Sequence, residues 1–329
     1  MITQQSFLTP SNPGLDSGSF SFARYLAVKK SIDDRSLNRG VWDCLAESLP
    51  KSSPENPLKV LEVGAGIGTM IERMIAAGLL QDAIYTAIDA NEAHIRIASE
   101  RLADWGISRG FKIIASKSGL QLEKEGHIIE ILLEAVDLYE FAERERGRKF
   151  WDLCIAHAIL DLLNIPSTLP VLFNLIEERG SGRGYFYFSI NFDGLTAFEP
   201  VLDSGFDECI QELYHRTMDE RRSNGRPTGG SRSGRRLFNL LRESGAQLLA
   251  AGSSDWVVFP GRDGYTADEA YFLHFLIDTV SGALAGNLDL DPARFDSWVS
   301  RRHEQIEQGE LSLIVHQLDF FGKPPLKTA

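Results

Sequence analysis

Apolar and polar positions alternate at helical intervals near the start of the chain. Between residues 20 and 48, apolar side chains recur every three or four positions, including Tyr25, Val28 and Ile32. This periodicity predicts one or two amphipathic helices. Pro54 and Pro57 then interrupt the pattern, and the apolar run LKVLEV follows directly. We expect this run, residues 58–63, to be the first buried strand.

Beyond residue 58, short apolar runs alternate with helical patterns. Strands are predicted over 58–63 and 83–88, each followed by a helix, over 69–77 and 92–105. Further strands are expected at 111–115 or 128–133, at 151–156 and at 184–190. The segment 128–133 is the better candidate for the sheet, and 111–122 is expected as a side hairpin. Such alternation predicts a parallel sheet with helices on both faces.

The last third of the chain adds strands and two insertions. Strands are expected over 247–251, running on to 256–259, and over 311–320. About fifty residues with two helical patterns separate them, and such an insertion often carries a substrate site or an interface. We therefore predict an α/β fold with a seven-stranded, mostly parallel sheet whose last strand is antiparallel. A tail and helical cap (1–57) precede a domain (58–329) with insertions near 195–236 and 261–310.

Composition narrows the class of protein. The 329 residues are 43% hydrophobic and 24% charged, which is ordinary for a globular protein. No run approaches the roughly 18 uncharged apolar residues of a membrane span. Residues 1–20 are polar and lack the basic start and apolar stretch of a secretory signal, so we expect a mobile or draped tail.

Net charge and cysteine content argue against a nucleic-acid substrate and against a metal ion. The net charge of −12 argues against a nucleic-acid substrate, although the stretch from Arg221 to Arg236 is locally basic. The three cysteines, Cys44, Cys154 and Cys209, have no metal-ligand spacing, and we expect no metal. We expect the cysteines to be reduced thiols, which suggests that the protein lies in the cytoplasm. The sequence leaves the oligomeric state open, a homodimer included.

Three glycines follow the first predicted strand. Gly64, Gly66 and Gly68 lie between that strand and the helix that begins near Thr69. Glycines permit a tight turn and close approach of the backbone to a ligand, while the helix N-terminus offers free N–H donors. Asp89 ends the next strand about twenty residues later, where a carboxylate can accept hydrogen bonds from ribose hydroxyls. Together these features predict a site for a nucleotide or nucleoside cofactor.

The glycine spacing separates two cofactor classes. A dinucleotide site has the pattern G-x-G-x-x-G, whose third glycine would stand at Thr69 here. This chain has G-x-G-x-G instead, with Glu62 two residues before the first glycine. The segment from Glu62 to Gly68 resembles the first motif of class I S-adenosylmethionine-dependent methyltransferases, an acidic residue followed by x-G-x-G-x-G. The resemblance extends over about residues 58–190 by motif.

The resemblance implies a set of cofactor contacts. Glu62 would help hold the methionine amino end of S-adenosylmethionine, and Asp89 would bind the ribose. Ala90 and Leu138 would pack against the adenine, and Asp137 would contact its amino group. A helix N-cap or a solvated acid is the alternative for Asp137. The turn residues that would line the cofactor are Gly64, Ala65, Gly66 and Gly68.

The strand at 151–156 is similar to the family's fourth motif. Asp152-Leu153-Cys154 is close to the usual D-[LV]-[IV] start. The following AHAI departs from the [DN]-P-P-[YF] of many amino- and base-methylating enzymes, which argues against adenine or glutamine N-methylation of that type. His157 stands at the carboxyl end of the strand, where ligands bind in such sheets, so it is a candidate cofactor contact. A purely structural histidine is the alternative.

Candidate acceptor contacts follow the fifth strand. We expect Asn191 and Asp193 to leave the sheet at its ligand-binding end. A helix follows, on which spacing puts Tyr214 and Met218 on one face and His215 and Asp219 on another. The predicted substrate contacts are Asn191, Asp193, Tyr214, His215 and Trp256. The alternatives are that the helix residues are polar because that face of the helix is exposed, and that Trp256 packs in the core.

Histidines are the candidate proton acceptors. His157 or His215 would serve as the base for a hydroxyl or protonated amine, because histidine titrates near neutral pH. Tyr25 and Lys29 would close over the methionine end. Arginines at 226, 232, 235 and 236 would grip an anionic group or lie on a surface loop. The aromatic side chains near 265–275 are expected either to pack in the core or to form a lid over the site.

The predicted activity is methyl transfer from S-adenosylmethionine to a small acceptor with an O, N or C nucleophile, with S-adenosylhomocysteine as the product. One rival is a methyltransferase acting on protein or RNA, which would need an open basic groove. Another is a non-catalytic protein that binds the same cofactor. An NAD-dependent dehydrogenase is disfavoured by Thr69 and by the lack of a recognisable catalytic tyrosine–lysine pair.

Overall fold

The structure, a computed structural model, describes residues 21–326 except 117, 149, 177, 180, 181 and 224. The tail expected over residues 1–20 lies outside the described residues. Within the described part of the chain, none of the helices combines the length and the apolar character that crossing a membrane requires.

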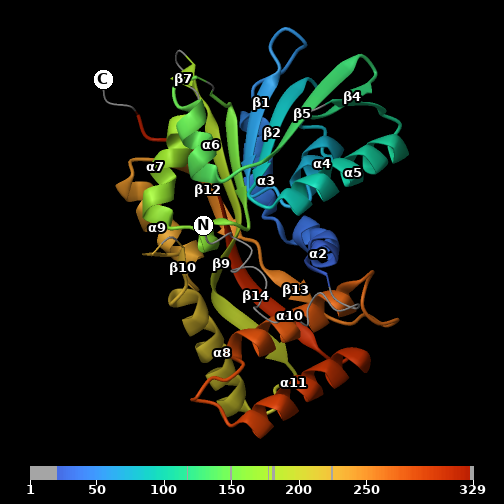
Figure 1. Ribbon diagram of the computed structural model, residues 1–329, viewed down its shortest axis with the longest axis vertical. Coiled ribbons are helices and arrows are strands. Elements are labelled where there is room, and N and C mark those ends of the chain that lie inside the picture. The colour runs from blue at the N-terminus through green and yellow to red at the C-terminus, as the bar shows by residue number, and fades with distance from the viewer. Residues whose placement is uncertain are drawn as a thin grey trace.

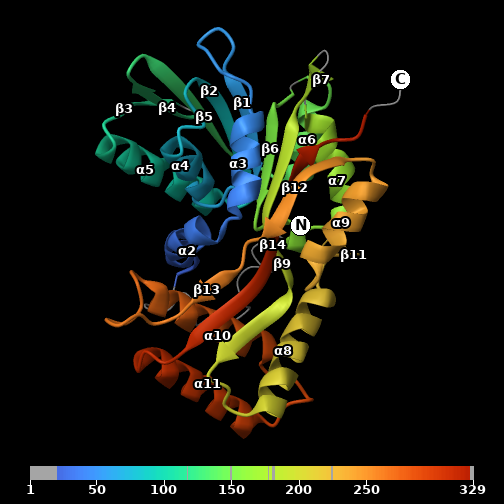
Figure 2. The same ribbon diagram turned by 180° about the vertical axis from the view of Figure 1, so that it is seen from behind.

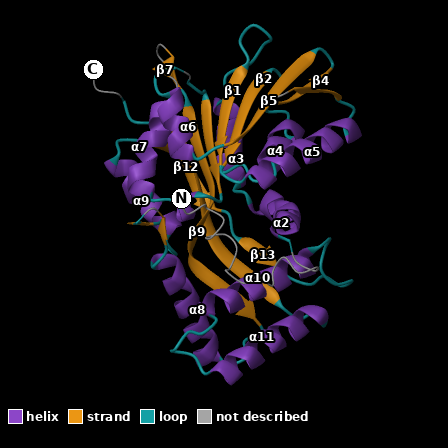
Figure 3. Ribbon diagram, viewed as in Figure 1, coloured by secondary structure: helices purple, strands orange, loops and turns teal. Residues whose placement is uncertain are grey.

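Five parallel strands form the centre of the sheet, in the order β9-β6-β1-β2-β5 (Figures 1 and 3). Their bounds are Leu58–Val63 (β1), Ala83–Asp89 (β2), His127–Ala135 (β5), Leu153–His157 (β6) and Tyr185–Glu199 (β9). The prediction that residues 128–133 enter the parallel sheet is confirmed. Every residue from Leu153 to His157 is buried, as expected for a strand with helices on both faces.

Antiparallel strands extend both edges of this centre. On one side lie β14 (Ser312–Lys323), β12 (Gln247–Ser253) and the short β13 (Trp256–Val258), and on the other lie β4 (Gly119–Lys124) and β3 (Lys112–Ser116). The antiparallel last strand is confirmed. The prediction of seven strands is wrong, because ten strands of the described residues belong to this sheet. The hairpin β3–β4 pairs with the outer edge of β5, and the segment predicted to run from 247 to 259 divides into β12 and β13.

Helices cover both faces of the sheet. Alternate residues of β1 enter separate apolar clusters, Val60 on one face and Leu61 and Val63 on the other. The first cluster includes residues of α2 (Phe22–Ser36), α3 (Arg39–Ser48), α4 (Thr69–Ala76) and α5 (Glu92–Ser108). The second includes residues of α6 (Leu138–Glu145), α7 (Ile165–Leu175) and α9 (Ser233–Glu243). The doubly wound, Rossmann-like α/β architecture predicted from the sequence is therefore confirmed.

The N-terminal helices begin at side-chain caps. Ser21 accepts a hydrogen bond from the amide of Arg24 at the start of α2, and Asn38 accepts one from the amide of Val41 at the start of α3. The Asn38 side chain also donates to the Ser253 carbonyl at 2.9 Å, and the Asn38 backbone N–H donates to the Asp319 carboxylate. These bonds fix the junction between α2 and α3 against the β12–β14 edge of the sheet.

Strands β9 and β14 continue beyond the other strands as a two-stranded ribbon. β9 spans 15 residues and β14 spans 12. Figures 1 and 2 show this ribbon running past the sheet into a lower layer formed by α8 (Ser204–Asp219), α10 (Glu269–Leu284) and α11 (Pro292–Glu307). The segments predicted as insertions supply this layer. Two-residue strands pair as the hairpins Arg222–Ser223 with Arg226–Pro227 (β10, β11) and Glu178–Arg179 with Gly182–Arg183 (β7, β8).

A buried ion pair joins two helices of the lower layer. Arg302 of α11 is completely buried, and its Nη2 donates to Asp207 Oδ1 of α8 at 2.7 Å. Its Nη1 donates to the Pro200 carbonyl at 2.8 Å, and the Trp298 indole also donates to Asp207. A buried charge needs such partners, because it has lost its hydration.

The stability of the protein should depend on the partner of the buried Arg302. We expect Asp207→Ala to lower the free energy of unfolding by about 3–5 kcal/mol, because Arg302 stays buried without its counter-charge. The control is Glu100→Ala, which breaks the exposed Arg96–Glu100 pair and should cost less than about 1 kcal/mol. Urea unfolding followed by circular dichroism measures both. Equal effects of the two substitutions would contradict this account.

Candidate functional site

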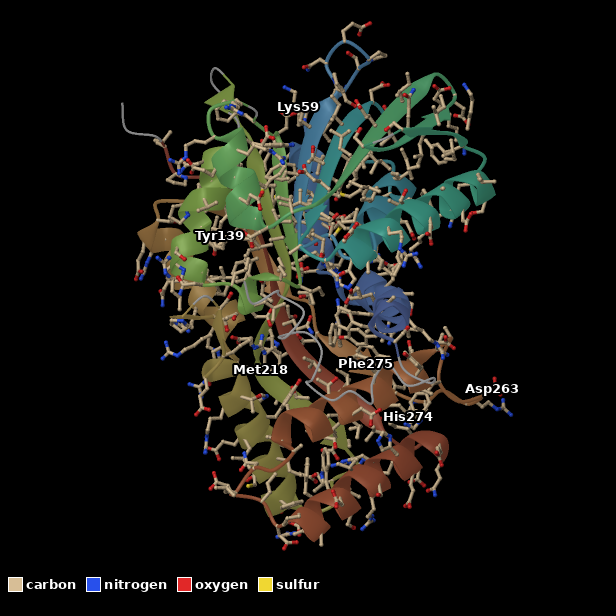
Figure 4. All side chains as sticks on the ribbon, in the orientation of Figure 1. Lys59, Tyr139, Met218, Asp263, His274 and Phe275 are labelled. Carbon is tan, nitrogen blue, oxygen red and sulfur yellow. The ribbon has the colours of Figure 1, made fainter. Side chains whose placement is uncertain are left out.

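A cavity of about 320 Å³ lies at the carboxyl ends of the parallel strands. Ligands bind at this edge in open α/β sheets, and the volume is that of a small-molecule site. Its walls come from the residues after β1, β2 and β6, from the ribbon β9–β14 and from α2, α8 and α10. Figure 4 labels Met218 of α8 and Phe275 of α10, which belong to two of these walls.

The glycine turn forms one end of the cavity. Gly64, Gly66 and Gly68 have φ angles of 68°, 54° and 78°, in the left-handed region that favours glycine. Gly64 and Gly66 line the cavity, whereas Gly68 precedes α4. A Cβ atom at Gly64 would lie 2.7 Å from the Ile159 side chain. The turn therefore needs glycine both for its backbone conformation and for the close packing of Ile159.

Asp89 is joined directly to the turn. The Gly66 N–H donates to Asp89 Oδ2 at 2.9 Å, and the Asn91 N–H donates to Asp89 Oδ1 at 2.8 Å. His94 Nδ1 lies 3.3 Å from Oδ1. Asp89 also lines the cavity. A carboxylate offers about four lone-pair sites, so Asp89 retains capacity for ligand hydroxyls. The predicted approach of the turn to this carboxylate is confirmed.

Glu62 is a buried acid beneath the turn. It is 1% exposed, it lines the cavity, and the Tyr85 hydroxyl donates to its Oε2 at 2.9 Å. Burial raises the pKa of Glu62 to about 8, although the hydrogen bond from Tyr85 acts in the opposite direction. A cationic ligand group placed beside Glu62 would favour its ionised form.

His157 lines the cavity but is held at both ring nitrogens. Nδ1 lies 2.8 Å from Ser189 Oγ and Nε2 lies 3.1 Å from Asp33 Oδ2. Burial lowers the pKa of His157 to about 4, despite the Asp33 carboxylate. The imidazole is therefore neutral at pH 7 and engaged in the protein. This geometry gives His157 a structural role and disfavours the predicted role as a proton acceptor.

Asp33 joins α2 to the sheet. Its carboxylate accepts from Lys29 Nζ at 2.6 Å and from the Trp256 indole at 2.9 Å. Although burial raises the pKa of Asp33, Lys29 and the bond to His157 lower it overall. Asp33 and Lys29 both line the cavity. The sequence signal for this pair was two opposite charges at i and i+4, each directly after an apolar residue of the helix, Val28 or Ile32.

The remaining predicted cofactor contacts lie outside the cavity wall. Asp137 is the N-cap of α6, where it accepts hydrogen bonds from the amides of Tyr139 and Glu140. The capping alternative therefore describes its position. Among the described residues, the lining of the cavity does not include Gly68, Ala90, Asp137 or Leu138.

Two of the predicted substrate contacts, Asn191 and Asp193, lie on β9. The sequence predicted that this strand ends near residue 190, but it continues to Glu199. Ile190 and Phe192 line the cavity, whereas Asn191 donates to the Leu318 carbonyl and Asp193 pairs with Arg235 at 2.9 Å. Successive residues of a strand point to opposite faces. Asn191 and Asp193 therefore point away from the face of β9 that lines the cavity.

Helix α8 has the two faces that its spacing predicted. Tyr214 and Met218 line the cavity, and Trp256 does so from β13. His215 lies outside the lining, with its ring centroid 5.4 Å from that of Phe192. Burial lowers the pKa of His215 below its usual value. His215 is therefore set behind the cavity wall.

Aromatic rings of α2 and α10 close another side. Tyr25 stacks on Phe275 with ring centroids 4.3 Å apart, and both line the cavity, as does Phe22. The predicted closure by Tyr25 and Lys29 agrees with their position. The aromatic pattern of α10 is mostly core, since Tyr271 and Phe272 are buried, and Tyr265 bonds to the Leu311 carbonyl. His274 contacts His303 at 2.7 Å, away from the cavity.

Sequence reasoning missed two charged residues of the wall. Asp161 lies in the short 3-10 helix Leu160–Leu162 after β6, and Arg221 follows α8. Both line the cavity. Of the arginines in the glycine-rich loop, Arg235 pairs with Asp193 and Arg236 donates to the Gly229 carbonyl. Within the described residues, no cluster of three or more His, Cys, Asp or Glu side chains is arranged to hold a metal ion.

No family model and no curated protein matches the chain. Several solved structures are similar. A methyltransferase from Thiobacillus denitrificans in complex with S-adenosyl-L-homocysteine is 12% identical, with a TM-score of 0.41 over 89% of this chain and 97% of that one. Phosphoethanolamine N-methyltransferase 2 from Haemonchus contortus, in complex with S-adenosyl-L-methionine, is 11% identical, with a TM-score of 0.41 over 95% and 59%.

The plantazolicin methyltransferase BpumL, in complex with S-adenosylhomocysteine, is 12% identical, with a TM-score of 0.39 over 92% of this chain and 88% of that one. Since the identities and TM-scores are this low, the function of the site must be inferred from the residues of this chain.

Substitution at the turn should separate backbone strain from crowding. We expect Gly64→Ala to lower the free energy of unfolding by about 2 kcal/mol or more, because left-handed strain of about 1–2 kcal/mol adds to the contact with Ile159. The control is Gly78→Ala, with φ of 72° and open space around its Cβ position. The free energy of unfolding of Gly78→Ala should fall only by the cost of the left-handed strain. Urea unfolding of both variants checks this, and a smaller loss for Gly64→Ala would refute it.

Proposed function

We propose that the protein binds S-adenosylmethionine and transfers its methyl group to a small organic acceptor, releasing S-adenosylhomocysteine. The proposal depends on one observation: the Gly66 amide donates a hydrogen bond to Asp89, and both residues line the same cavity. The glycine turn and the carboxylate can therefore contact the same ligand. In the proposed complex, Asp89 accepts hydrogen bonds from the ribose hydroxyls, and Gly64 to Gly66 border the methionine end.

The charges of the cavity fit a cationic cofactor. Three carboxylates line it, from Asp33, Asp89 and Asp161, against the two cations Lys29 and Arg221, and Glu62 adds a fourth negative charge when a cationic group favours its ionised form. S-adenosylmethionine carries a sulfonium, an ammonium and a carboxylate, so its net charge is positive. NAD carries two phosphates, which an acidic wall disfavours. The G-x-G-x-G spacing favours the same choice.

The bound cofactor would supply an activated methyl group for direct displacement by a nucleophile. The protein's part is alignment and exclusion of water. Tyr25 and Phe275 stack over one side of the cavity, and residues of the β9–β14 ribbon close another. In the described part of the chain, the lining of the cavity has aromatic side chains and only two cations, Lys29 and Arg221, which favours a small acceptor over the protein or RNA alternative, because those would need a basic groove.

Calorimetry with S-adenosylhomocysteine and with NAD tests the cofactor. We expect only S-adenosylhomocysteine to bind, and Asp89→Ala to weaken binding by about 100-fold or more, because two hydrogen bonds to a charged group are lost at about 1.5–3 kcal/mol each. Asp291→Ala is the control, which removes the N-cap of α11 outside the cavity and should leave the affinity nearly unchanged. Binding of NAD alone would overturn the proposal.

The affinity for S-adenosylhomocysteine should also depend on Glu62. Its pKa of about 8 means that Glu62 is mostly protonated at pH 6–7, and a cofactor ammonium beside it would drive proton release. Affinity should therefore rise with pH between 6 and 7.5, by up to about tenfold per unit. Glu62→Gln should remove the pH dependence and the proton release, both measured by calorimetry in buffers of different ionisation enthalpy. A flat profile in the unsubstituted protein would contradict this role.

A further inference from the structure

A carboxylate and a guanidinium face one another in the cavity wall without a direct hydrogen bond. Asp161 Oδ2 and Arg221 Nη1 are 4.0 Å apart, and their side chains are 24% and 20% exposed. Hydrogen bonds of this kind require about 2.7–3.2 Å. Within the described residues, no other side chain pairs with the Arg221 guanidinium. A ligand oxygen about 2.8 Å from both atoms would complete the contact.

The pair lies beside the glycine turn. Ile159 packs directly on Gly64, and Asp161 follows two residues later in the same short segment. The Asp161 carboxyl also interacts electrostatically with Lys29, which comes from α2. The pair is therefore at the end of the acceptor space that is closest to the proposed methionine part of the cofactor.

Two tyrosine rings flank the pair. Tyr25 and Tyr214 line the cavity, and Asp161 acts electrostatically on both hydroxyls. Burial raises the pKa of Tyr214 to about 12 and also raises that of Tyr25, so both stay neutral at pH 7. The Tyr25 ring is already stacked on Phe275, so Tyr214 offers the aromatic surface against which a planar ligand can pack.

We propose that the acceptor is an aromatic hydroxyl compound whose oxygen lies between Asp161 and Arg221. This inference rests on the proposed function. The phenolic O–H bond breaks and its proton passes to the Asp161 carboxylate, while the oxygen forms a bond to the methyl carbon. The methyl–sulfur bond breaks, and its electron pair stays on sulfur as the thioether. Arg221 stabilises the developing phenolate, and Asp161 later releases the proton to water.

The paired charges select against other nucleophiles. An ammonium placed at Asp161 would be repelled by Arg221, and a carboxylate placed at Arg221 would be repelled by Asp161. A hydroxyl donates to the first and accepts from the second. Burial raises the pKa of Asp161, despite Arg221, which makes its carboxylate a better proton acceptor.

Three ligands with one ring test this selection: 4-nitrophenol, 4-nitrobenzylamine and 4-nitrobenzoate. Binding is measured by difference absorbance with saturating S-adenosylhomocysteine. We expect 4-nitrophenol to bind most tightly, and Arg221→Gln to weaken its binding by about tenfold or more and to reduce the bound phenolate fraction. Arg226→Gln, on the β10–β11 hairpin outside the cavity lining, is the matched control and should change neither.

The Asp161→Asn variant tests the proton transfer. Asparagine keeps the shape but cannot accept the proton, so methyl transfer to 4-nitrophenol should fall by about 100-fold or more near pH 6. The rate should recover as pH rises through the pKa of the phenol, because phenolate needs no base. A purely structural role of Asp161 would lower the rate equally at every pH.

The inference is overturned if the amine or the acid binds more tightly than the phenol, if no ligand of the three binds, or if Arg221→Gln has no effect on 4-nitrophenol. It is also overturned if the rate of Asp161→Asn falls without recovery at high pH. Affinity for S-adenosylhomocysteine should stay within about twofold in both variants. If S-adenosylhomocysteine does not bind the unsubstituted protein, the proposed function itself has failed.

Discussion

The hydrogen bond from the Gly66 amide to Asp89 is the constraint on which the site depends. It joins the loop after β1 to the end of β2, two strands that pair in parallel from Leu58 to Val63. That pairing fixes the height at which both strands end, and the left-handed glycines let the loop bend back onto the carboxylate. A ligand that contacts the turn must therefore also meet Asp89. The local chain geometry and the sheet register define one position for it.

The rest of the cavity is assembled from distant segments around this position. Asp33 brings α2 against His157 and Trp256, so the N-terminal cap is held by buried polar contacts as well as by apolar packing. The ribbon β9–β14 extends the wall of the cavity past the sheet, and α10 supplies a further wall. Asp161 and Arg221 line the same cavity but stand 4.0 Å apart. That separation marks the acceptor end of the site.

Much of this arrangement follows from local sequence patterns, and part of it does not. The glycine turn, Asp89 and the parallel strands depend on neighbouring residues, so spacing and periodicity predicted them. The extension of β9 was missed because the polar residues Asn191 and Asp193 end the apolar run of this strand, although Asn191 donates to the Leu318 carbonyl and Asp193 pairs with Arg235. Asp137 has the position that the family pattern suggests, yet its carboxylate caps α6. The Asp161–Arg221 pair brings the 3-10 helix after β6 beside the residue that follows α8, a tertiary contact that no local pattern encodes.

A crystal structure of the protein with S-adenosylhomocysteine tests the central claim most directly. The account predicts that both ribose hydroxyls lie within about 3 Å of the Asp89 carboxylate, with the homocysteine part against Gly64 and Gly66. Binding of the ligand away from this cavity, or a ribose that makes no contact with Asp89, would contradict it.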